Sequence, residues 1–584
     1  MEEAAAAHVA HVSFAPGATH LKLQLRLHDD RKTFFRLATE RLERVRYRLQ
    51  LLASAPQPPA KQKKKRKNGT GGGAAPTVSV KFLDADGQEI GAKAATVGDA
   101  LMRTRSLRVG SQTFVVLHNQ PLVTGLKVLE PVMVGVPVSP LPETEFCAAD
   151  ECSWRWFRLD EHQERSEQTP GTLVSTQRRY TPTEHELGCT FYVECHAPTL
   201  RSEFAEDSKA EVLTPPVVAG PNRDVFRERR RMGATSAAEK YPDAAEAFRV
   251  MSYNVLYDGY ATADHAKKNL FPYVDANIMK ESRRIQLILQ EIEETNSDIV
   301  CLQEMGEHIY KIFFEPMMAS IGFHGFYSGK TGTTNEGCAV FVRTERFEVV
   351  EEETLNLAIA VQSSANPASQ GLLQDFPEIA KGINRIPSIA QVVILRSKTD
   401  PARSIILTNT HLFYRGDAHL IRLLQGAALV DSVSQRKSEP GFGNAAIIMC
   451  GDWNAHPRTA LVAYLLDGQI DSTHRHWQQA PSFRWNLSRV DENNSHGSTS
   501  NTAPIRPNRF EHALQLVSAC GIPAFTNFVT SFVDTLDYIM IGSKTLQVRD
   551  VFPFFTEEEV THEVALPSST FPSDHVSLVC DLTW

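Results

Sequence analysis

The pattern of apolar positions changes near residue 248, and the change predicts two kinds of structure along the chain. After this point, apolar runs of strand length alternate with amphipathic segments. Residues 281–294 show the i, i+3, i+4, i+7 spacing of a helix with one buried face, formed by Ile285, Ile288, Leu289 and Ile292. Strands are expected at residues 248–255, 298–303, 404–412, 445–450, 536–541 and 576–582. The alternation predicts an α/β fold for residues 248–584.

Residues 1–247 follow a mainly strand-like pattern that turn residues interrupt. The alternation over residues 21–27 predicts a strand, and the amphipathic stretch 34–52 predicts a helix. Short apolar runs punctuated by Pro and Gly then predict a small β-sandwich that packs or presents substrate. The predicted organisation is an N-terminal α/β segment (1–55), a disordered Pro/Lys/Gly-rich linker (56–76), a β-rich module (77–215), a second linker (216–247) and the α/β domain (248–584).

Composition limits the classes of function. The chain has 584 residues, 61 Lys and Arg against 69 Asp and Glu, and a net charge of −8. This acidity argues against coating nucleic acid by bulk charge, although a local basic cleft is compatible with it. No run approaches the ~18 apolar residues of a membrane span, so we expect no membrane partner. The lysine-rich part of the first linker is interpreted either as a solvated spacer or as a nuclear-import signal or RNA tether.

The nine cysteines indicate a reducing compartment. Their number is odd and they are scattered along the chain, which favours free thiols over disulfides. The pairs Cys147/Cys152 and Cys189/Cys195 suggest zinc, but their spacing matches zinc knuckles poorly, so buried thiols are the preferred interpretation. The amino-terminal residues lack the features of a secretory or mitochondrial leader, which by itself favours the cytoplasm.

Eight polar residues stand in, or next to, the predicted buried strands or strand ends. Each alone has a structural explanation, such as a helix cap, a core histidine or a turn, but their joint recurrence beside apolar runs indicates one site. Oxygen ligands without clustered Cys or His favour Mg²⁺, or Mn²⁺, over zinc. The eight are Asn254, Glu304, His411, Asp452, Asn454, Asp537, Asp574 and His575.

Six short motifs containing these residues occur in the order found in the exonuclease–endonuclease–phosphatase superfamily, which the chain resembles. They are Ser-Tyr-Asn (252–254), Leu-Gln-Glu (302–304), Asn-Thr-His (409–411), Gly-Asp-Trp-Asn (451–454), Asp-Tyr-Ile (537–539) and Ser-Asp-His (573–575). The longer strings 518–527 and 565–582 resemble the 2′,5′-phosphodiesterase branch. The resemblance implies a two-sheet α/β-sandwich catalytic domain preceded by a β-rich N-terminal region.

The resemblance also implies an activity. That branch consists of Mg²⁺-dependent 3′→5′ exoribonucleases that hydrolyse 2′,5′-linked oligoadenylates and 3′,5′ poly(A) tails to AMP, a role in mRNA processing, in the mitochondrial matrix. The expected partner is therefore oligoadenylate or poly(A) RNA. The alternatives are a poly(A)-specific deadenylase without 2′,5′ activity, a phosphoinositide phosphatase and a non-catalytic RNA-binding scaffold. Residues 1–247 show none of the leucine-rich repeats usual in such deadenylases, and a scaffold need not retain all eight polar residues.

Residue roles follow from the resemblance motif by motif. It implies that Glu304 is the principal Mg²⁺ ligand, with Asn254 and Asp574 beside it. Asp452, held by Asn454, would orient or deprotonate the attacking water. Asp537 would orient His575, which contacts the scissile phosphate or shares the base role, and His411 would donate to the phosphoryl oxygens.

Three substrate contacts are implied as well. Phe532 falls where related deadenylases stack the terminal adenine, although simple loop packing explains it equally well. Asn527 is assigned to the substrate side of the same region. The relatives keep a phosphate-contacting lysine before the Glu-Gly turn at 336–337. Direct counting puts Thr333 there, and Lys330 takes the role only if the loop carries an insertion.

Overall fold

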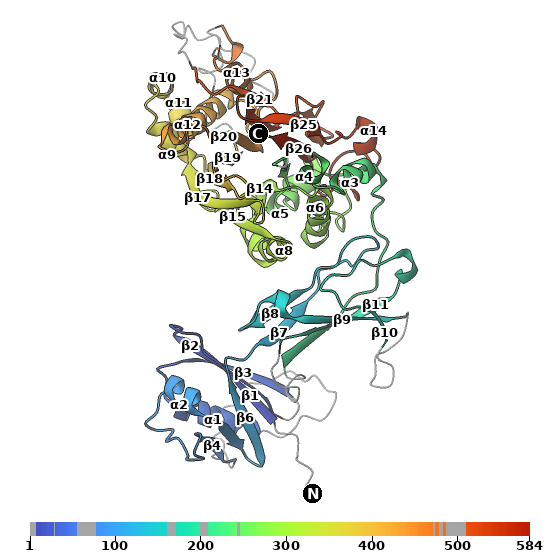
Figure 1. Ribbon diagram of the computed structural model, residues 1–584, viewed down its shortest axis with the longest axis vertical. Coiled ribbons are helices and arrows are strands. Elements are labelled where there is room, and N and C mark those ends of the chain that lie inside the picture. Colours follow the sequence, from blue (N-terminus) through green and yellow to red (C-terminus); the bar gives the residue numbers. More distant parts are fainter. Residues whose placement is uncertain are drawn as a thin grey trace. The chain divides into compact units, whose positions relative to one another are not determined.

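The computed structural model describes residues 8–27, 30–54, 78–160, 171–198, 208–241, 246–470, 473–477, 483–485 and 510–584. Two compact units divide the chain. Unit 1 comprises Met1–Val128, Ser139–Tyr180 and Gly188–Val217, and unit 2 comprises Leu129–Val138, Thr181–Leu187 and Val218–Trp584 (Figure 1). The predicted linker 56–76 lies outside the described residues.

The first part of unit 1 is a six-stranded sheet with two helices on one face. Its order is β3-β2-β1-β6-β5-β4, formed by β1 (His8–Ser13), β2 (His20–Leu27), β3 (Asp30–Leu37), β4 (Val80–Leu83), β5 (Ser106–Val109) and β6 (Gln112–His118). Helices α1 (Leu42–Ala53) and α2 (Val97–Arg103) share its apolar core. The predicted strand at 21–27 is confirmed. The predicted helix at 34–52 is wrong at its start, because Phe34 pairs with Leu23 in the β2–β3 hairpin and the helix begins at Leu42.

This sheet also crosses the predicted boundary between residues 1–55 and 77–215, since β1 pairs in parallel with β6. The remainder of unit 1 is β-rich, as predicted. It contains the hairpin β7 (Leu122–Lys127) and β8 (Leu141–Glu145), the short helix η1 (Ala149–Glu151), and a sheet of order β10-β9-β11-β12; the short helix η2 (Glu184–Glu186) belongs to unit 2. Those strands are β9 (Ser153–Leu159), β10 (Thr172–Ser175), β11 (Thr190–His196) and β12 (Lys209–Leu213).

The cysteines behave as the preferred interpretation predicts. All nine are free, and eight of them are buried, with Cys147 half-buried. No cysteine takes part in a group of metal-ligating side chains within the described part of the chain.

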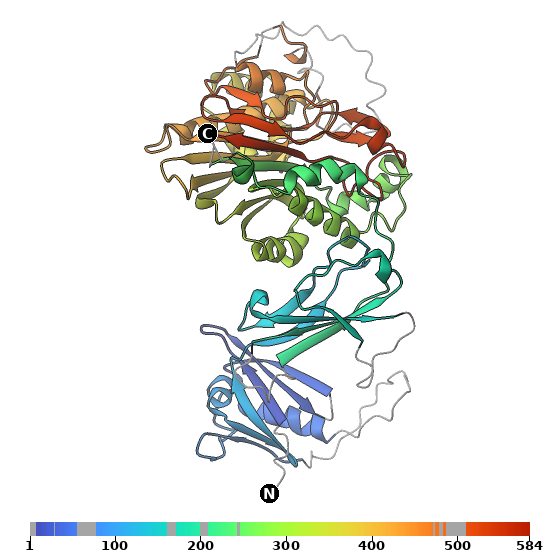
Figure 2. The ribbon, with the colours of Figure 1, turned by 45° about the vertical axis from the view of Figure 1, so that its right-hand side comes forward.

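Unit 2 is built on two six-stranded sheets that pack face to face (Figure 2). The first has the order β15-β16-β14-β13-β26-β25 and the second the order β17-β18-β19-β20-β24-β21. Val250 and Cys301 of the first sheet share one core with Leu407 and Ile448 of the second. The predicted two-sheet α/β sandwich is confirmed.

The strands of the two sheets have the following bounds. The first sheet contains β13 (Phe248–Asn254), β14 (Ile299–Gly306), β15 (Phe323–Gly329), β16 (Glu336–Arg343), β25 (Gln547–Val551) and β26 (Leu578–Thr583). The second contains β17 (Phe347–Asn356), β18 (Ile389–Ser397), β19 (Ser404–His411), β20 (Ala446–Asp452), β21 (Leu516–Ser518) and β24 (Asp537–Gly542). A separate hairpin joins β22 (Asn527–Val529) to β23 (Phe532–Asp534).

Helices cover the outer faces of both sheets. The second sheet packs its outer apolar side chains against α9 (Leu357–Gln362), α10 (Pro367–Asp375), α11 (Pro377–Arg385), α12 (His419–Ser438) and α13 (Ala460–Asp467). Helix α6 (Glu281–Thr295), predicted from its periodicity, lies on the first sheet. Shorter helices are α5 (Asp258–Ala261), η6 (Ala266–Leu270), α7 (Glu307–Ile309), η7 (Tyr310–Phe314), α8 (Glu315–Ser320) and α14 (Glu557–Val560). Among the described residues, no helix has the length and apolarity to span a membrane.

The predicted linker 216–247 is wrong as a linker, because most of its described residues are folded onto unit 2. It contains η4 (Asp224–Phe226), α3 (Arg227–Gly233) and α4 (Ala237–Lys240). Arg229 is buried and donates to Ser577 Oγ at 2.6 Å and to Pro553 O at 3.0 Å. A Cβ at Gly233 would meet Glu294 O at 1.8 Å, so α3 approaches the end of α6 as closely as the backbone allows. Of the charged residues that suggested a linker, Arg223 and Arg229 are buried, whereas Arg227, Glu228 and Arg231 stay exposed.

Candidate active site

The candidate site lies at one edge of the stacked sheets, where polar residues end or begin the strands. His411 ends β19, Asp452 ends β20 and Asp537 begins β24. These three are register partners across the second sheet, because β19 and β20 are parallel and β24 is antiparallel to β20. Asn254 ends β13 of the facing sheet. Buried strands therefore deliver four of the eight predicted side chains to a single edge.

Glu304 reaches the site through an irregularity in β14. The register between β14 and β16 shifts between Gln303 and Met305, so Glu304 is the extra residue of a β-bulge. Its φ of +57° lies in the left-handed region, which costs a non-glycine residue free energy and is often found at functional sites. Glu304 Oε2 accepts a hydrogen bond from the Tyr257 backbone N–H at 2.9 Å. The bulge aims a carboxylate that a regular strand would point elsewhere.

Asn254 joins the two principal carboxylates. Its Nδ2 donates to Glu304 Oε1 at 3.1 Å and to Asp452 Oδ2 at 3.0 Å, while its Oδ1 accepts from the Leu256 N–H. In this orientation, Asn254 positions the carboxylates by donation and its amide oxygen is turned toward the backbone. Asp574 lines the same cavity, and its Oδ2 accepts from Asn527 Nδ2 at 3.3 Å.

Asp452 is buried, and Asn454, two residues along the chain, holds its carboxylate. The Asn454 backbone N–H donates to Asp452 Oδ1 at 2.9 Å, and Asn454 Nδ2 donates to Leu412 O at 2.9 Å, which fixes the end of β19. Burial and the nearby Asp537 carboxylate raise the pKa of Asp452 to about 7. A carboxylate with this pKa can accept a proton from water near neutral pH.

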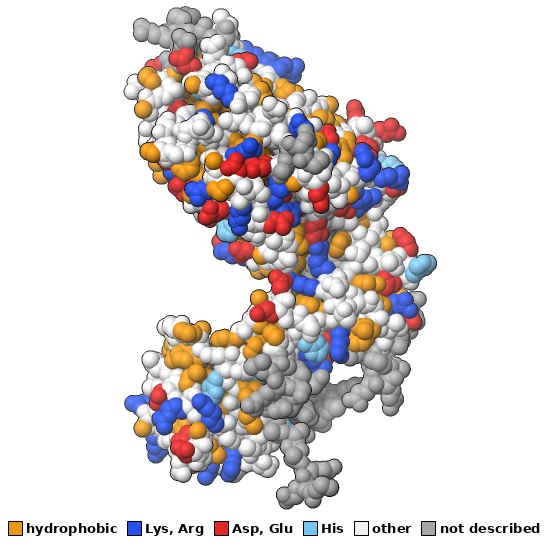
Figure 3. Space-filling model, viewed as in Figure 1, with side chains coloured by type: hydrophobic (Ala, Val, Ile, Leu, Met, Phe, Trp, Pro, Cys, Tyr) orange, Lys and Arg blue, Asp and Glu red, His pale blue; other side chains and the backbone are white. Residues whose placement is uncertain are grey.

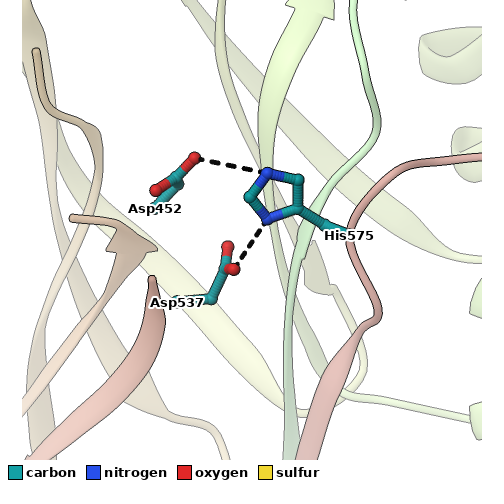
Figure 4. Close-up of side chains that lie close together, drawn as sticks. All are labelled: Asp452, Asp537 and His575. Carbon is teal, nitrogen blue, oxygen red and sulfur yellow. Dashed lines mark hydrogen bonds and ion pairs between the residues drawn. The ribbon is translucent and has the colours of Figure 1, made fainter. Parts of the chain in front are cut away.

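Asp537 and His575 form a buried pair beside Asp452 (Figure 4). His575 Nδ1 donates to Asp537 Oδ2 at 2.7 Å, which turns Nε2 toward Asp452 Oδ2 at 3.8 Å. Burial disfavours the charged ring, but Asp537, Asp574 and Asp452 outweigh it and raise the pKa of His575 well above its ordinary value. The imidazolium is therefore available to stabilise negative charge on a bound phosphate.

Asp537→Asn is expected to lower kcat by roughly 10- to 100-fold with little change in KM. The substitution replaces a charge-assisted hydrogen bond to His575 by a neutral one, and such bonds are worth about 1.5–3 kcal/mol. Steady-state hydrolysis of an oligonucleotide substrate measures the effect, with the exposed Asp375→Asn as the matched control. An unchanged kcat would refute the orienting role.

His411 and Lys330 meet on the other side of the carboxylates. Lys330 Nζ donates to His411 Nδ1 at 3.1 Å, so His411 Nε2 carries the hydrogen and faces Asp452 Oδ2 at 3.7 Å and Glu304 Oε1 at 3.9 Å. Burial, Lys330 and His575 lower the pKa of His411 well below its ordinary value. His411 is thus a neutral donor whose Nε2–H faces the two carboxylates.

The conformation of the loop between β15 and β16 shows which residue occupies the place expected for the phosphate-contacting lysine. Thr333 is exposed, whereas the Lys330 ammonium is buried and lies 2.5 Å from Glu336 Oε1. Tyr260 also donates to Glu336 Oε1, at 3.0 Å. Lys330, and not Thr333, therefore lies in the site, which is the arrangement predicted for a loop that carries an insertion. Glu336 was not among the residues predicted for the site; its place in the Glu-Gly turn at 336–337, next to the expected lysine, was the available signal.

A second group that sequence reasoning missed lies between the two sheets under the site. Gln303 Nε2 donates to Asn409 Oδ1 at 2.8 Å, and Asn409 Nδ2 donates to Gln391 Oε1 at 3.0 Å. All three side chains are fully buried, and their bonds join β14 to β19 and β18. Their motifs, Leu-Gln-Glu and Asn-Thr-His, contained two of them, but only the packing of two sheets shows that they connect.

The carboxylates fit a divalent cation. Burial, Asp574 and Glu336 outweigh the opposing effects of the Tyr257 N–H and Lys330 and raise the pKa of Glu304 to about 7, as expected for crowded buried carboxylates. Glu304 and Asp574 offer the hard oxygen donors that Mg²⁺ or Mn²⁺ prefers. Asp452, Asp537 and His575 also satisfy a three-ligand geometry among the described residues. However, the surrounding carboxylates raise the pKa of His575 well above its ordinary value, and an imidazolium has no lone pair for a metal, so that trio acts better as a proton-handling group.

Six of the eight predicted residues line one cavity of about 950 Å³, namely Glu304, His411, Asp452, Asn454, Asp574 and His575. Its walls include Asn527 and Phe532 from the β22–β23 hairpin, and Phe532 is 44% exposed. This exposure argues against simple loop packing for Phe532, because a packing residue would be covered. Among the predicted substrate contacts, Phe532, Lys330 and Asn527 all lie at the cavity.

Comparisons with known proteins agree with this geometry. The model of the endonuclease/exonuclease/phosphatase family matches residues 251–575, more than half of the chain. The chain belongs to this family. As a member, it is an enzyme of the nuclease and phosphodiesterase type, and the matched region contains all eight predicted catalytic and metal-site residues.

Known relatives match different fractions of this chain. The bovine (Bos taurus) 2′,5′-phosphodiesterase 12 is 30% identical over 508 residues, which cover 83% of this chain and 77% of the relative. The CCR4-Not complex 3′-5′-exoribonuclease subunit Ccr4 of Schizosaccharomyces pombe is 26% identical over 57% of this chain and 49% of its own. The crystal structure of ANGEL2, a 2′,3′-cyclic phosphatase, superposes with a TM-score of 0.47 at 23% identity, covering 57% of this chain and 95% of that structure.

Proposed function

We propose that the protein is a Mg²⁺-dependent 3′→5′ exoribonuclease that hydrolyses 2′,5′-linked oligoadenylates and 3′,5′ poly(A) tails to AMP. The observation that carries the proposal is the extent of the similarity to 2′,5′-phosphodiesterase 12, which includes most of the chain before residue 248. The similarity to Ccr4 covers only 57% of the chain. This difference favours the 2′,5′-phosphodiesterase activity over that of a deadenylase without it.

The residues of the site divide the chemistry of phosphodiester hydrolysis among them. Asp452 is the proposed base: its pKa of about 7 and its buried position suit the deprotonation of an attacking water. Asn454 and Asn254 hold that carboxylate from two directions. A divalent cation, held by Glu304 and Asp574, would neutralise charge on the phosphate when bound.

Three side chains are proposed to bind the scissile phosphate. His575 contributes a positive charge that Asp537 orients, Lys330 contributes a second, and His411 donates from its neutral ring. These groups are fixed before substrate arrives, so they lower the barrier without reorganisation at the moment of reaction. Phe532 is proposed to stack the terminal adenine, a contact typically worth about 1–3 kcal/mol.

The proposal is tested with paired substrates of one length. Purified protein is given 2′,5′-triadenylate and 3′,5′-triadenylate, each with Mg²⁺ or with EDTA, and AMP release is followed. Mg²⁺-dependent release from both is the expected result. Cleavage of the 3′,5′ substrate alone would make the protein an ordinary deadenylase. Cleavage of neither would contradict the proposal and favour a phosphoinositide substrate or a scaffold.

A further inference from the structure

One wall of the cavity is the first turn of α12, and its composition is unusual for a helix N-terminus. Helix α12 runs for 20 residues from His419 to Ser438, its N-cap Ala418 offers no side-chain cap, and its first turn contains no acidic residue. A helix N-terminus has unpaired N–H groups and a partial positive charge, so acidic side chains or caps are favoured there. This turn instead carries His419 and Arg422, and both line the cavity.

Arg422 is a buried cation without an anionic partner. It is 2% exposed, and its Nη1 donates to Phe413 O at 2.8 Å and to Arg415 O at 2.6 Å. Within the described residues, no carboxylate lies within 4.0 Å of it and its Nε has no acceptor. The neighbouring Asp417 is paired with Arg415 at 2.5 Å. Because a buried charge is costly without a countercharge, this part of the cavity favours an anion.

Two histidines complete this wall as donors. Arg422 Nη2 donates to His419 Nδ1 at 3.1 Å, so the neutral His419 ring keeps its hydrogen on Nε2. The ring is fixed from behind by stacking on His476, with centroids 3.9 Å apart, and His476 Nδ1 accepts from the Ala460 N–H. His456 lies 5.9 Å from His419, lines the cavity, and its Nδ1 has no partner among the described residues.

We propose that His419, Arg422 and His456 form a second phosphate subsite, which binds the phosphate next to the scissile one, on its 5′ side, in the substrate chain. This inference rests on the proposed function. The cavity, at about 950 Å³, is at the upper end of the usual size for ligand pockets and has room beyond a single nucleotide. On the face shown in Figure 3, acidic and basic side chains of unit 2 are interspersed, so this face carries no large patch of a single charge.

The test compares two substrates that differ by one phosphate and share both bases. The dinucleotide A2′p5′A contains only the scissile phosphate, whereas pA2′p5′A adds the phosphate on the 5′ side. The kcat/KM for pA2′p5′A divided by that for A2′p5′A therefore measures how much the subsite contributes to substrate recognition. We expect the wild-type protein to favour the phosphorylated dimer roughly 10- to 100-fold, as charge-assisted hydrogen bonds predict. His456→Ala, His419→Ala and Arg422→Gln are each expected to lower this ratio several-fold.

Controls separate binding from folding and from the proposed function. Arg422 also donates to Phe413 O, so Arg422→Gln can disturb the fold of that loop. His456→Ala removes no side-chain hydrogen bond among the described residues, so it still tests the subsite if Arg422→Gln fails to fold. Arg436→Gln removes an arginine from the other end of α12 and is expected to keep the ratio. Calorimetric affinities of both dimers in EDTA are expected to show the same preference without turnover.

The outcomes are distinct. A wild-type ratio near one, or a ratio that falls equally in Arg436→Gln, would overturn the subsite, as would a ratio unchanged in both histidine variants. If wild-type protein with Mg²⁺ cleaves neither dimer nor either triadenylate, the proposed function itself fails. A preference for the phosphorylated dimer in calorimetry that is lost in His456→Ala would still support an anion subsite in that case.

Discussion

Replacing Asp452 by asparagine is expected to lower kcat by roughly 10²- to 10⁴-fold, the usual contribution of a general base, while RNA binding stays largely intact. Asparagine has the same size, and its amide oxygen can still accept a hydrogen bond from the Asn454 N–H, whereas its amide nitrogen loses the hydrogen bond from Asn254 Nδ2. It cannot take a proton from water. The loss therefore falls on the chemical step and leaves the fold and the cavity walls in place.

Single-turnover hydrolysis of 2′,5′-triadenylate, together with equilibrium binding of the same oligonucleotide in EDTA, measures the two effects separately. Asp467→Asn, an exposed aspartate at the end of α13, is the matched control and is expected to behave as wild type. Turnover that survives in the Asp452 variant would exclude this residue as the base and direct attention to His575.

Replacing Glu304 by glutamine is expected to abolish Mg²⁺-dependent turnover and, at the same time, to stabilise the metal-free protein. Burial raises the pKa of Glu304 from 4.5 to about 7, so the ionised carboxylate destabilises the folded state, and this cost grows as pH rises from about 4.5 to about 7. At pH 8 the cost is fully present. We therefore expect glutamine to raise the free energy of unfolding in EDTA by about 1–3 kcal/mol at pH 8, with a smaller gain at pH 5.

Thermal unfolding with and without Mg²⁺ provides a readout that does not depend on activity. In the wild-type protein, Mg²⁺ is expected to raise Tm by binding the folded state, and in the glutamine variant this increase is expected to vanish. Glu307→Gln, an exposed glutamate three residues along the chain, serves as the control and should keep the Mg²⁺ effect. A variant that keeps both the Mg²⁺-dependent rise in Tm and turnover would rule out Glu304 as the metal ligand.

The strands of unit 2 were predictable because their periodicity is a local property. Phe248–Asn254 and Ala446–Asp452 are buried along their whole length, and strand-length, mainly apolar segments that end in a polar residue are visible without any partner. Helix α6 was equally visible from its apolar stripe. Residues 34–37 were harder to predict, because an amphipathic helix and an edge strand with one buried face show similar patterns over four positions. The pairing of Phe34 with Leu23 in the hairpin makes this segment a strand.

The predicted linker at 216–247 failed for a related reason. Its arginines look like a solvated run, and only the approach of α3 to α6 and to the loop at Ser577 gives Arg229 its buried acceptors. A charged segment is expected to be exposed to solvent unless other parts of the chain supply hydrogen-bond acceptors or opposite charges for it. Here residues more than 300 positions away supply the compensation.

The sequence by itself determined the two-sheet α/β class of unit 2, the eight polar residues of the site and the family to which they belong, because strand periodicity and motif order are written along the chain. The tertiary structure alone decided that Glu304 projects from a bulge, that Lys330 and Glu336 pair inside the site, and that Arg422 lies in the cavity wall with no carboxylate within ion-pair distance among the described residues. These features depend on which backbones approach and on what water is excluded, and both arise only when distant segments pack together.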